Sequence, residues 1–270
     1  MSTLESGLYR LGWLDEFSGR DTPMHRIDPR AKVLATGVFL VCVVSLGKYD
    51  LLALLPFVIF PIVLMSESGM PPRELGVRLA IAAPFALVVG VFNPLLDQVV
   101  VGTIGPIAVT GGWVSYASIM MRFLLTTSAA LMLIATTGMT GVCAGIERLG
   151  VPDVLSTQLL FLYRYIFVLA EEVMRLARAR SLRSFDHRGM GVRVYGSILG
   201  HLLLRSIARA QRVFDAMQCR GFDGHVRTRT ALRMNGHDWA FLWGWSAVFI
   251  LFRFVNVPLL LGGLVTKVIS

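Results

Sequence analysis

Two apolar stretches, VLATGVFLVCVVSLG (Val33–Gly47) and LLALLPFVIFPIVLM (Leu51–Met65), decide the fold of this chain. Neither contains a charged residue, and only Lys48–Asp50 separates them. A helix needs about 20 apolar residues to cross a bilayer, or about 17 at the short end, so flanking residues must complete each span. The pair is typical of a tight hairpin of two membrane-spanning helices.

Three further runs have the same character. Leu79–Leu96 is free of charge, Val114–Thr137 is broken only by Arg122, and Trp239–Leu264 is broken only by Arg253. The whole chain is 55% hydrophobic and 16% charged, against about 25% charged in ordinary soluble domains. We therefore predict an all-α, polytopic helical membrane protein with about five transmembrane helices.

The positive charge is concentrated in one segment. Arg164–Arg233 holds fourteen arginines and five acidic residues, whereas the remaining 200 residues carry twelve basic and twelve acidic ones. Basic segments of membrane proteins stay in the cytoplasm, so we expect this segment there, with the amino terminus and the PPRELGVR loop (Pro71–Arg78). The Asp97–Trp113 loop has no Lys or Arg and is expected outside, as a hairpin or a re-entrant element.

These assignments predict a division of the chain. Residues 1–30 form a cytoplasmic segment, 31–137 transmembrane helices 1–4, 138–235 a cytoplasmic section, and 236–270 the last transmembrane helix. Arg122 fits in one of two ways. Either it faces a polar interior or a partner, because a charge within the bilayer is costly, or the fourth span starts after it.

The cytoplasmic section has the pattern of two long amphipathic helices. Apolar residues recur at spacings of three and four residues on one face of each helix. These are Leu162, Ile166, Leu169, Val173 and Leu176 in the first, and Leu203, Ile207, Ala210, Phe214 and Met217 in the second.

A basic phrase occurs twice in this section, 37 residues apart. Its aligned pairs are Arg175 and Arg212, Ala179 and Ala216, Arg183 and Arg220, and Ser184 and Gly221. Positions i, i+4 and i+8 share one helix face, and a small residue after the last arginine suits a helix end. Each copy is thus expected to present an arginine beside a small-residue notch at a helix terminus, to fit two similar sockets.

The arginines also fit other interpretations. Polybasic helices beside a membrane also bind lipid headgroups. Nucleic-acid binding is disfavoured, since no aromatic interleaving or known module accompanies the charge. The lysine count is only three, and the preference for arginine favours forked contacts to carboxylates or phosphates.

Motifs of catalysis are absent from the sequence. It has no G-x-x-x-x-G-K-[ST] loop for phosphates, no G-x-S-x-G nucleophile motif, and no paired histidines or C-x-x-C spacing for a metal. We predict that the chain is not an enzyme and holds no cofactor or metal of its own.

The duplicated phrase resembles the Ala-Arg-Gly motifs, two per chain, of the T component (EcfT family) of energy-coupling-factor (ECF) transporters, closest to the cobalt-uptake branch CbiQ. The two copies read Leu182-Arg183-Ser184 and Cys219-Arg220-Gly221, so the first residue differs in both and the glycine in one. HRIDPRAKVL (His25–Leu34), RLGVP (Arg148–Pro152) and YRYIFVLAEEVMRLARA (Tyr163–Ala179) also look like segments of that family.

The resemblance implies a multi-pass subunit in the bacterial plasma membrane. It would couple two ATP-binding-cassette ATPase subunits to a separate substrate-binding membrane (S) component, and its arginine-bearing helices would be the coupling helices. The solute implied is cobalt, with nickel or a vitamin as alternatives. A lipid-acting membrane enzyme and a structural anchor that recruits a soluble partner are competing hypotheses.

Overall fold

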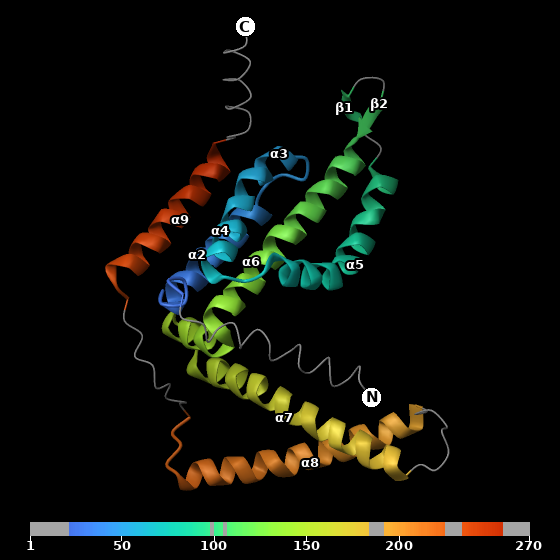
Figure 1. Ribbon diagram of the computed structural model, residues 1–270, viewed down its shortest axis with the longest axis vertical. Coiled ribbons are helices and arrows are strands. Elements are labelled where there is room, and N and C mark those ends of the chain that lie inside the picture. The colour runs from blue at the N-terminus through green and yellow to red at the C-terminus, as the bar shows by residue number, and fades with distance from the viewer. Residues whose placement is uncertain (1–21, 98–99, 105–106, 184–191, 225–233, 256–270) are drawn as a thin grey trace. The chain divides into compact units, whose positions relative to one another are not determined.

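The computed structural model describes residues 22–97, 100–104, 107–183, 192–224 and 234–255 (Figure 1). The chain divides at Gly138 into two compact units. The membrane unit comprises the described residues up to Gly138 together with 234–255. The helix-pair unit comprises the described residues from Met139 to Gly224. Both units are built almost wholly of helices, so the predicted all-α class is confirmed.

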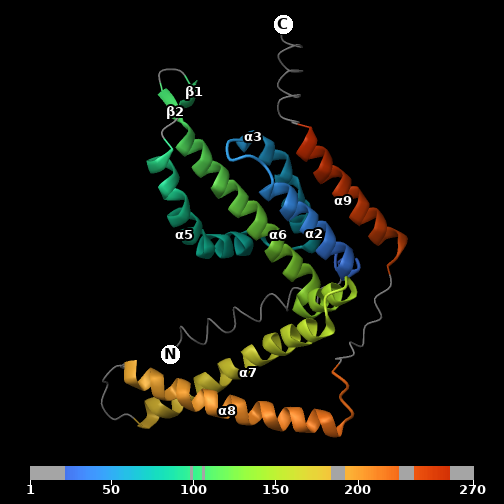
Figure 2. The same cartoon turned by 180° about the vertical axis from the view of Figure 1, so that it is seen from behind.

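The membrane unit contains most of the elements. In chain order they are α2 (Pro29–Val44), α3 (Leu51–Leu54), the 3₁₀ turn η1 (Leu55–Val58), α4 (Ile59–Ser68), α5 (Pro72–Leu96), β1 (Val100–Ile104), β2 (Ile107–Thr110), the part of α6 (Gly111–Arg148) that precedes Gly138, and α9 (Gly236–Phe254). α2 runs beside α9, and α5 flanks α6 in both views (Figures 1 and 2).

Helix α2 begins where the sequence signals a helix start. The Asp28 side chain accepts a hydrogen bond from the Arg30 amide and caps the helix, and Pro29 occupies its first turn. The small residues Ala31 and Ala35 then pack with Leu242 of α9. Small side chains allow membrane helices to approach closely, which explains how these two helices pair.

An aromatic cluster fills the core of the membrane unit. Phe39 of α2 lies with its ring centroid 4.8 Å from Phe60 of α4 and 5.2 Å from Phe249 of α9. Phe57 lies 6.0 Å from Phe39, and all four rings are almost completely buried. Residues far apart in the sequence therefore meet in one core.

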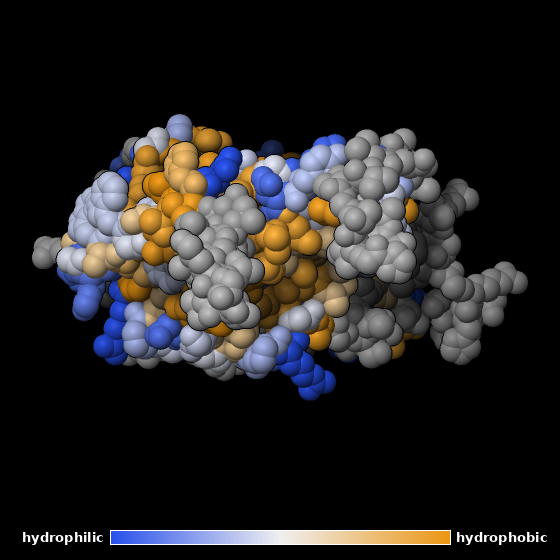
Figure 3. Space-filling view, turned by 90° about the horizontal axis from the view of Figure 1, so that it is seen from above, coloured by the Kyte–Doolittle hydropathy of each residue, from blue (hydrophilic) through white to orange (hydrophobic). Residues whose placement is uncertain are grey.

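Much of the outer surface of these helices is apolar, and hydrophobic residues lie beside hydrophilic ones on the face seen in Figure 3. Large exposed hydrophobic side chains include Val41 on α2, Ile62 on α4, Ile81 and Phe85 on α5, and Trp243 on α9. Soluble proteins rarely expose such surface, whereas acyl chains cover it without cost. This surface agrees with the membrane assignment made from composition.

Four stretches of described helix are long and apolar enough to cross a membrane: residues 51–68, 72–94, 111–148 and 153–180. The first three match predicted spans. The predicted first span is α2, with 16 residues. The predicted last span, Trp239–Leu264, includes α9 up to Phe254 and then residues outside the described part of the chain. Residues 153–180 lie in the section assigned to the cytoplasm. That assignment rests on charge and stays a prediction, since this stretch also qualifies by length and composition.

The expected Pro71–Arg78 loop is corrected by the structure. Helix α5 starts at Pro72, so all but the first residue of that stretch is helical. Proline is well placed in a first helical turn, where its missing N–H leaves no bond unmade, and Glu74 in that turn favours the helix dipole. Helix α5 therefore starts about two turns before the apolar run does.

The loop expected outside contains an antiparallel strand pair, in agreement with a hairpin, one of the two expected alternatives. Strands β1 and β2 pair antiparallel, with an irregularity between Val100 and Gly102. Beside it, Asp97 accepts hydrogen bonds from Lys48 (3.1 Å) and Tyr49 (2.6 Å). These contacts bring the α2–α3 connection and the hairpin loop to the same end of the unit, as the predicted topology requires.

Helix α6 runs through Arg122 without interruption. Its guanidinium donates to the carbonyls of Leu46 (2.9 Å) and Gly47, just past the end of α2. Arg122 thus lies against the turn that follows α2, and these contacts do not choose between the two alternatives predicted for it. The helix then breaks at Gly138, one residue beyond the predicted end of the span at Thr137.

Candidate functional site

The helix-pair unit is formed by the end of α6, α7 (Asp153–Arg183) and α8 (Val192–Cys219). Helix α7 begins one residue after Pro152, whose carbonyl accepts from the Leu155 amide. The two predicted long amphipathic helices are thus present. Side chains from the start of α7 and the end of α8 line one groove, so the helices pack with opposed directions.

An ion-pair cluster joins the two helices. Glu172 of α7 accepts a hydrogen bond from Arg205 of α8 at 2.7 Å and lies 3.8 Å from Arg209. The hydrogen bond from Arg205 holds the pKa of Glu172 below its usual value, with the positive charges of Arg205, Arg209 and Arg175 acting the same way. Two of the fourteen arginines, Arg205 and Arg209, therefore contribute to the pairing of the two helices.

The first copy of the duplicated phrase lies on the last turns of α7. Arg175, Ala179 and Arg183 are all exposed, and Arg183 is the last residue of the helix. Arg175 pairs with Glu171 at 3.0 Å, an exposed i, i+4 contact. Ser184 lies outside the described residues. Arg183 is thus the last described residue of α7, and the helix end expected after it stays a prediction.

The second copy ends α8 in the same manner. Arg212, Ala216 and Arg220 are exposed on the last turns, and Arg220 follows directly after the helix. Gly221 adopts the left-handed conformation with φ 77.

The turn after α8 is a Schellman motif. The Gly221 amide donates to the Gln218 carbonyl (2.9 Å) and the Phe222 amide to the Met217 carbonyl (3.0 Å). Because residues with a Cβ rarely adopt this conformation, the turn explains why a glycine follows Arg220.

The two arginines lie at opposite ends of the helix pair. Arg183 ends α7, while Arg220 lies near the groove residues at the start of α7. At 1.5 Å per residue, the intervening length of α7 separates them by about 40 Å. Each offers a planar fork suited to a carboxylate or phosphate. This arrangement can engage two separate acidic sites but cannot grip one small anion.

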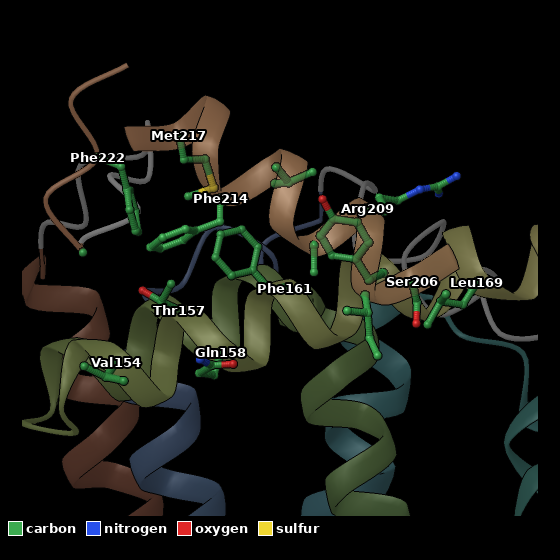
Figure 4. Close-up of a pocket in the computed structure, with 15 residues that line it drawn as sticks. Val154, Thr157, Gln158, Phe161, Leu169, Ser206, Arg209, Phe214, Met217 and Phe222 are labelled. Carbon is green, nitrogen blue, oxygen red and sulfur yellow. The ribbon is translucent and has the colours of Figure 1, made fainter. Parts of the chain in front are cut away.

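A groove of about 670 Å³ between α7 and α8 was not predicted as a site (Figure 4). Aromatic and aliphatic side chains point into it, among them Phe161 of α7 and Phe214, Met217 and Phe222 from α8 and its end. The apolar spacing of the two helices did indicate part of it, since Leu169, Ile207 and Ala210 also contribute. Leu162 and Leu203, from the same predicted faces, remain exposed instead.

Metal-ligating chemistry is not found in the part of the chain that the structure describes. Among those residues no three His, Cys, Asp or Glu side chains gather as a metal would require. The three cysteines are free thiols, with Cys42 and Cys143 buried and Cys219 exposed.

Comparison with known proteins gives a family match. The model of the CbiQ family, described as cobalt transport protein, matches residues 20–232. The match spans most of the membrane unit and the whole helix-pair unit, including both copies of the arginine phrase.

Individual relatives have names of the same kind. The chain is 29% identical over 255 residues to the energy-coupling factor transporter transmembrane protein EcfT of Heliobacterium modesticaldum, covering 88% of this chain and 95% of the relative. It is 31% identical over 119 residues to the nickel permease LarQ of Lactiplantibacillus plantarum, covering 44% of each chain. It is 29% identical over 112 residues to the cobalt transport protein CbiQ of Rhodobacter capsulatus, covering 41% of this chain and 46% of the relative.

These names describe transmembrane transport components and not enzymes, in agreement with the function class predicted from the sequence. Together with the apolar helices, they make the chain a multi-pass membrane protein. The chain belongs to the CbiQ family of cobalt transport proteins, the T components of energy-coupling-factor transporters.

Proposed function

We propose that the chain is the coupling subunit of an ECF-type importer in the plasma membrane. Two ATP-binding-cassette ATPase subunits would dock on its helix-pair unit, one at Arg183 and one at Arg220. The motion that they produce on binding ATP would pass through α7 and α8 to a separate substrate-binding membrane component. The single observation that carries this proposal is the pair of exposed arginines at two opposite helix ends.

The two arginines have similar surroundings, which supports docking of each in a specific socket of a partner and not a nonspecific role as surface charge. In each copy an exposed alanine, Ala179 or Ala216, lies one turn before the terminal arginine on the same face. A small side chain lets a partner backbone approach and bring acidic groups to the guanidinium. Contact with lipid headgroups would require neither the alanine nor the repetition.

The solute proposed is a divalent transition-metal cation, with cobalt first. Cobalt comes from the description of the family and from one relative, nickel from the name of another. A vitamin remains the alternative among solutes. The proposal assigns recognition of the solute to the S component, since the described residues of this chain gather no set of metal ligands.

The first prediction tests the sockets. A charged pair largely removed from water costs about 2–5 kcal/mol when one side is truncated, whereas a headgroup contact contributes only about 1 kcal/mol per basic residue. Arg183→Ala and Arg220→Ala should therefore each weaken ATPase binding by well over tenfold, since 1.4 kcal/mol is roughly a factor of ten. Pull-down of the ATPase subunits from solubilised membranes measures the effect.

The controls are basic residues outside the repeat. Arg164→Ala, on the exposed surface of α7, and Arg227→Ala should leave recruitment nearly unchanged. Lysine at position 183 or 220 should rescue only in part, because an ammonium cannot make the forked contact. If all four alanine variants weaken binding equally, the arginines act through lipid headgroups and the socket model is wrong.

A further inference from the structure

The break in α6 has a backbone conformation that only glycine adopts readily. Gly138 has φ 69 and ψ 155, inside what is otherwise a helix from Gly111 to Arg148. Residues with a Cβ are essentially excluded from this region. A break of this kind also deprives the preceding turn of its i+4 amide donors, so its carbonyls need other partners.

Lys32 of α2 supplies such a partner. Its ammonium donates to the Thr136 carbonyl at 2.9 Å, two residues before the break. The side chain is almost completely buried, with 2% of its surface exposed. Lysine is rarely buried to this extent unless it is paired. A buried ammonium on a helix carbonyl, in a unit otherwise packed with apolar side chains, requires a compensating negative charge.

Two buried carboxylates supply that charge. Asp28 and Asp238 are both nearly inaccessible, and both act electrostatically on Lys32. Asp28 caps the start of α2. Asp238 closes the capping box of α9, accepting from the Asn235 amide at 2.7 Å with one oxygen and from the Asp28 amide at 3.0 Å with the other.

Three helix ends therefore meet on one charge cluster: the starts of α2 and α9 and the broken end of α6. All of its members belong to the membrane unit, and Gly138 is the last residue of that unit before the chain enters the helix-pair unit. We propose that Lys32 is a positioning residue that holds the Gly138 break, so that the cluster sets the backbone conformation through which the chain leaves the membrane unit.

The proposal has a functional consequence that rests on the proposed function. If force from the ATPase subunits reaches the membrane unit through the chain at Gly138, a joint of fixed conformation transmits it and a loose joint dissipates it. Loss of the Lys32 contact should then uncouple transport without preventing assembly. Assembly depends on Arg183 and Arg220, which lie in the other unit.

The second prediction is tested on the complete complex with spin labels on either side of the break. Leu124→Cys and Arg148→Cys, both exposed, are labelled in a background in which the three native cysteines are replaced. A straight helix would separate these positions by about 36 Å. The native cluster should give one narrow distance population that differs from this value. Lys32→Met should broaden it and add a population near the straight-helix distance.

Solute uptake and ATPase recruitment are measured on the same variants. A hydrogen bond from a charged group shifts an equilibrium by roughly tenfold or more, so Lys32→Met should lower uptake by about that factor while recruitment stays unchanged. Lys48→Met is the matched control. Lys48 is an exposed lysine that pairs with Asp97 at the other end of the unit, and its loss should leave the distance and the uptake as they are.

Gly138→Ala tests the joint without touching the charge cluster. It should also broaden the distance and lower uptake, and the double variant should be no worse than the more severe single one, because both act on one break. Native distances in Lys32→Met, or additive effects in the double variant, would overturn the proposal. If the Lys32→Met protein does not reach the membrane, the same distance and uptake measurements on Lys32→Arg and Gly138→Ala test the proposal. A Gly138→Ala protein with native distances and uptake is then the overturning result.

Discussion

At the scale of single residues, two arginines in the membrane unit stabilise the end of one helix. Arg122 of α6 donates to the carbonyls of Leu46 and Gly47, and Arg253 of α9 donates to the Ser45 carbonyl (3.0 Å) and hydroxyl (2.8 Å). These carbonyls belong to the three residues that follow Val44, the last residue of α2, and positive charge beside the carboxyl end of a helix favours its dipole. Arg122 and Arg253, the only charged residues in two apolar runs, are thus explained by their hydrogen bonds to the residues that follow α2.

A third prediction concerns Gly112, where α6 begins. A Cβ here would lie 2.6 Å from Pro94 Cα and 2.7 Å from the Asp97 carbonyl oxygen, both backbone atoms of α5 and its end. The Gly112 amide also donates to that oxygen at 3.0 Å. Gly112→Ala should therefore destabilise the protein by about 1–3 kcal/mol, the usual effect of overpacking.

The matched control for Gly112 is Gly76, within α5, where a Cβ would meet nothing within 4 Å. Gly76→Ala should be neutral or slightly stabilising, because alanine is the better helix former by about 1 kcal/mol. Thermal unfolding of the purified proteins in detergent compares them. Equal midpoints for the two variants would show that α5 and α6 do not approach each other in this way.

At the scale of elements, α7 and α8 pair through few buried side chains. Much of their apolar surface stays exposed, including Leu155, Leu162, Leu199 and Leu204. Because so few side chains are buried between the two helices, the ion pairs of Glu172 help to set how α7 and α8 are oriented against each other.

The fourth prediction tests that role. Glu172→Gln should speed amide hydrogen exchange in α8 around Arg205, by a factor below about ten, since exposed ion pairs contribute modestly. Glu171→Gln on the same helix, where both partners are largely exposed, should have no such effect.

The pH dependence of the Glu172 contact has a definite sign. Because the pKa of Glu172 is lowered in the folded state, its contribution is fully present above the ordinary glutamate value of about 4.3. The contribution is lost as the pH falls through the lowered folded pKa. Exchange rates referenced to the Glu172→Gln protein should therefore show no loss of protection between neutral pH and about pH 5. A loss in that window would contradict the assigned Glu172–Arg205 contact.

At the scale of the whole molecule, contacts at both ends of the membrane unit agree with the topology predicted from charge. Lys48 and Asp97, from two loops expected outside, pair with each other. At the other end, the start of α2 meets the start of α9 and the break of α6, all expected inside. The two residues of each contact must lie on the same side of the membrane. The chain must therefore cross it an even number of times between Lys48 and Asp97, and likewise between Lys32 and Thr136.

The fifth prediction is the orientation itself. Single cysteines replace Lys48 and His201, both exposed, in a protein lacking its native cysteines. An impermeant thiol reagent applied to intact cells should label position 48 and spare position 201, which becomes reactive only after lysis. Labelling of 201 in intact cells would place α8 outside and remove the basis for ATPase docking.

Much of the candidate site was predictable because its determinants are local. Repeated residues at a spacing of four define one helix face wherever the helix lies, so Arg175, Ala179 and Arg183 could be grouped from the sequence. Gly221 after Arg220 predicted a helix end for a similar reason. The groove was not predictable, since its lining depends on which faces of α7 and α8 meet and where they cross.

The sequence by itself determined the class of the protein, because its apolar runs require a bilayer. The arginine excess predicts the orientation of the chain, and the duplicated phrase predicts two helix ends. These follow from composition and from periodicity along a single helix. The tertiary structure alone decided what the isolated charges do. The Lys32 ammonium donates to the carbonyl of Thr136, 104 positions away, and the Asp238 carboxylate accepts from the backbone amide of Asp28, 210 positions away. These contacts depend on helix packing that no local pattern encodes. Burial makes each of these charges dependent on a specific partner, and only the packed helices bring that partner within reach.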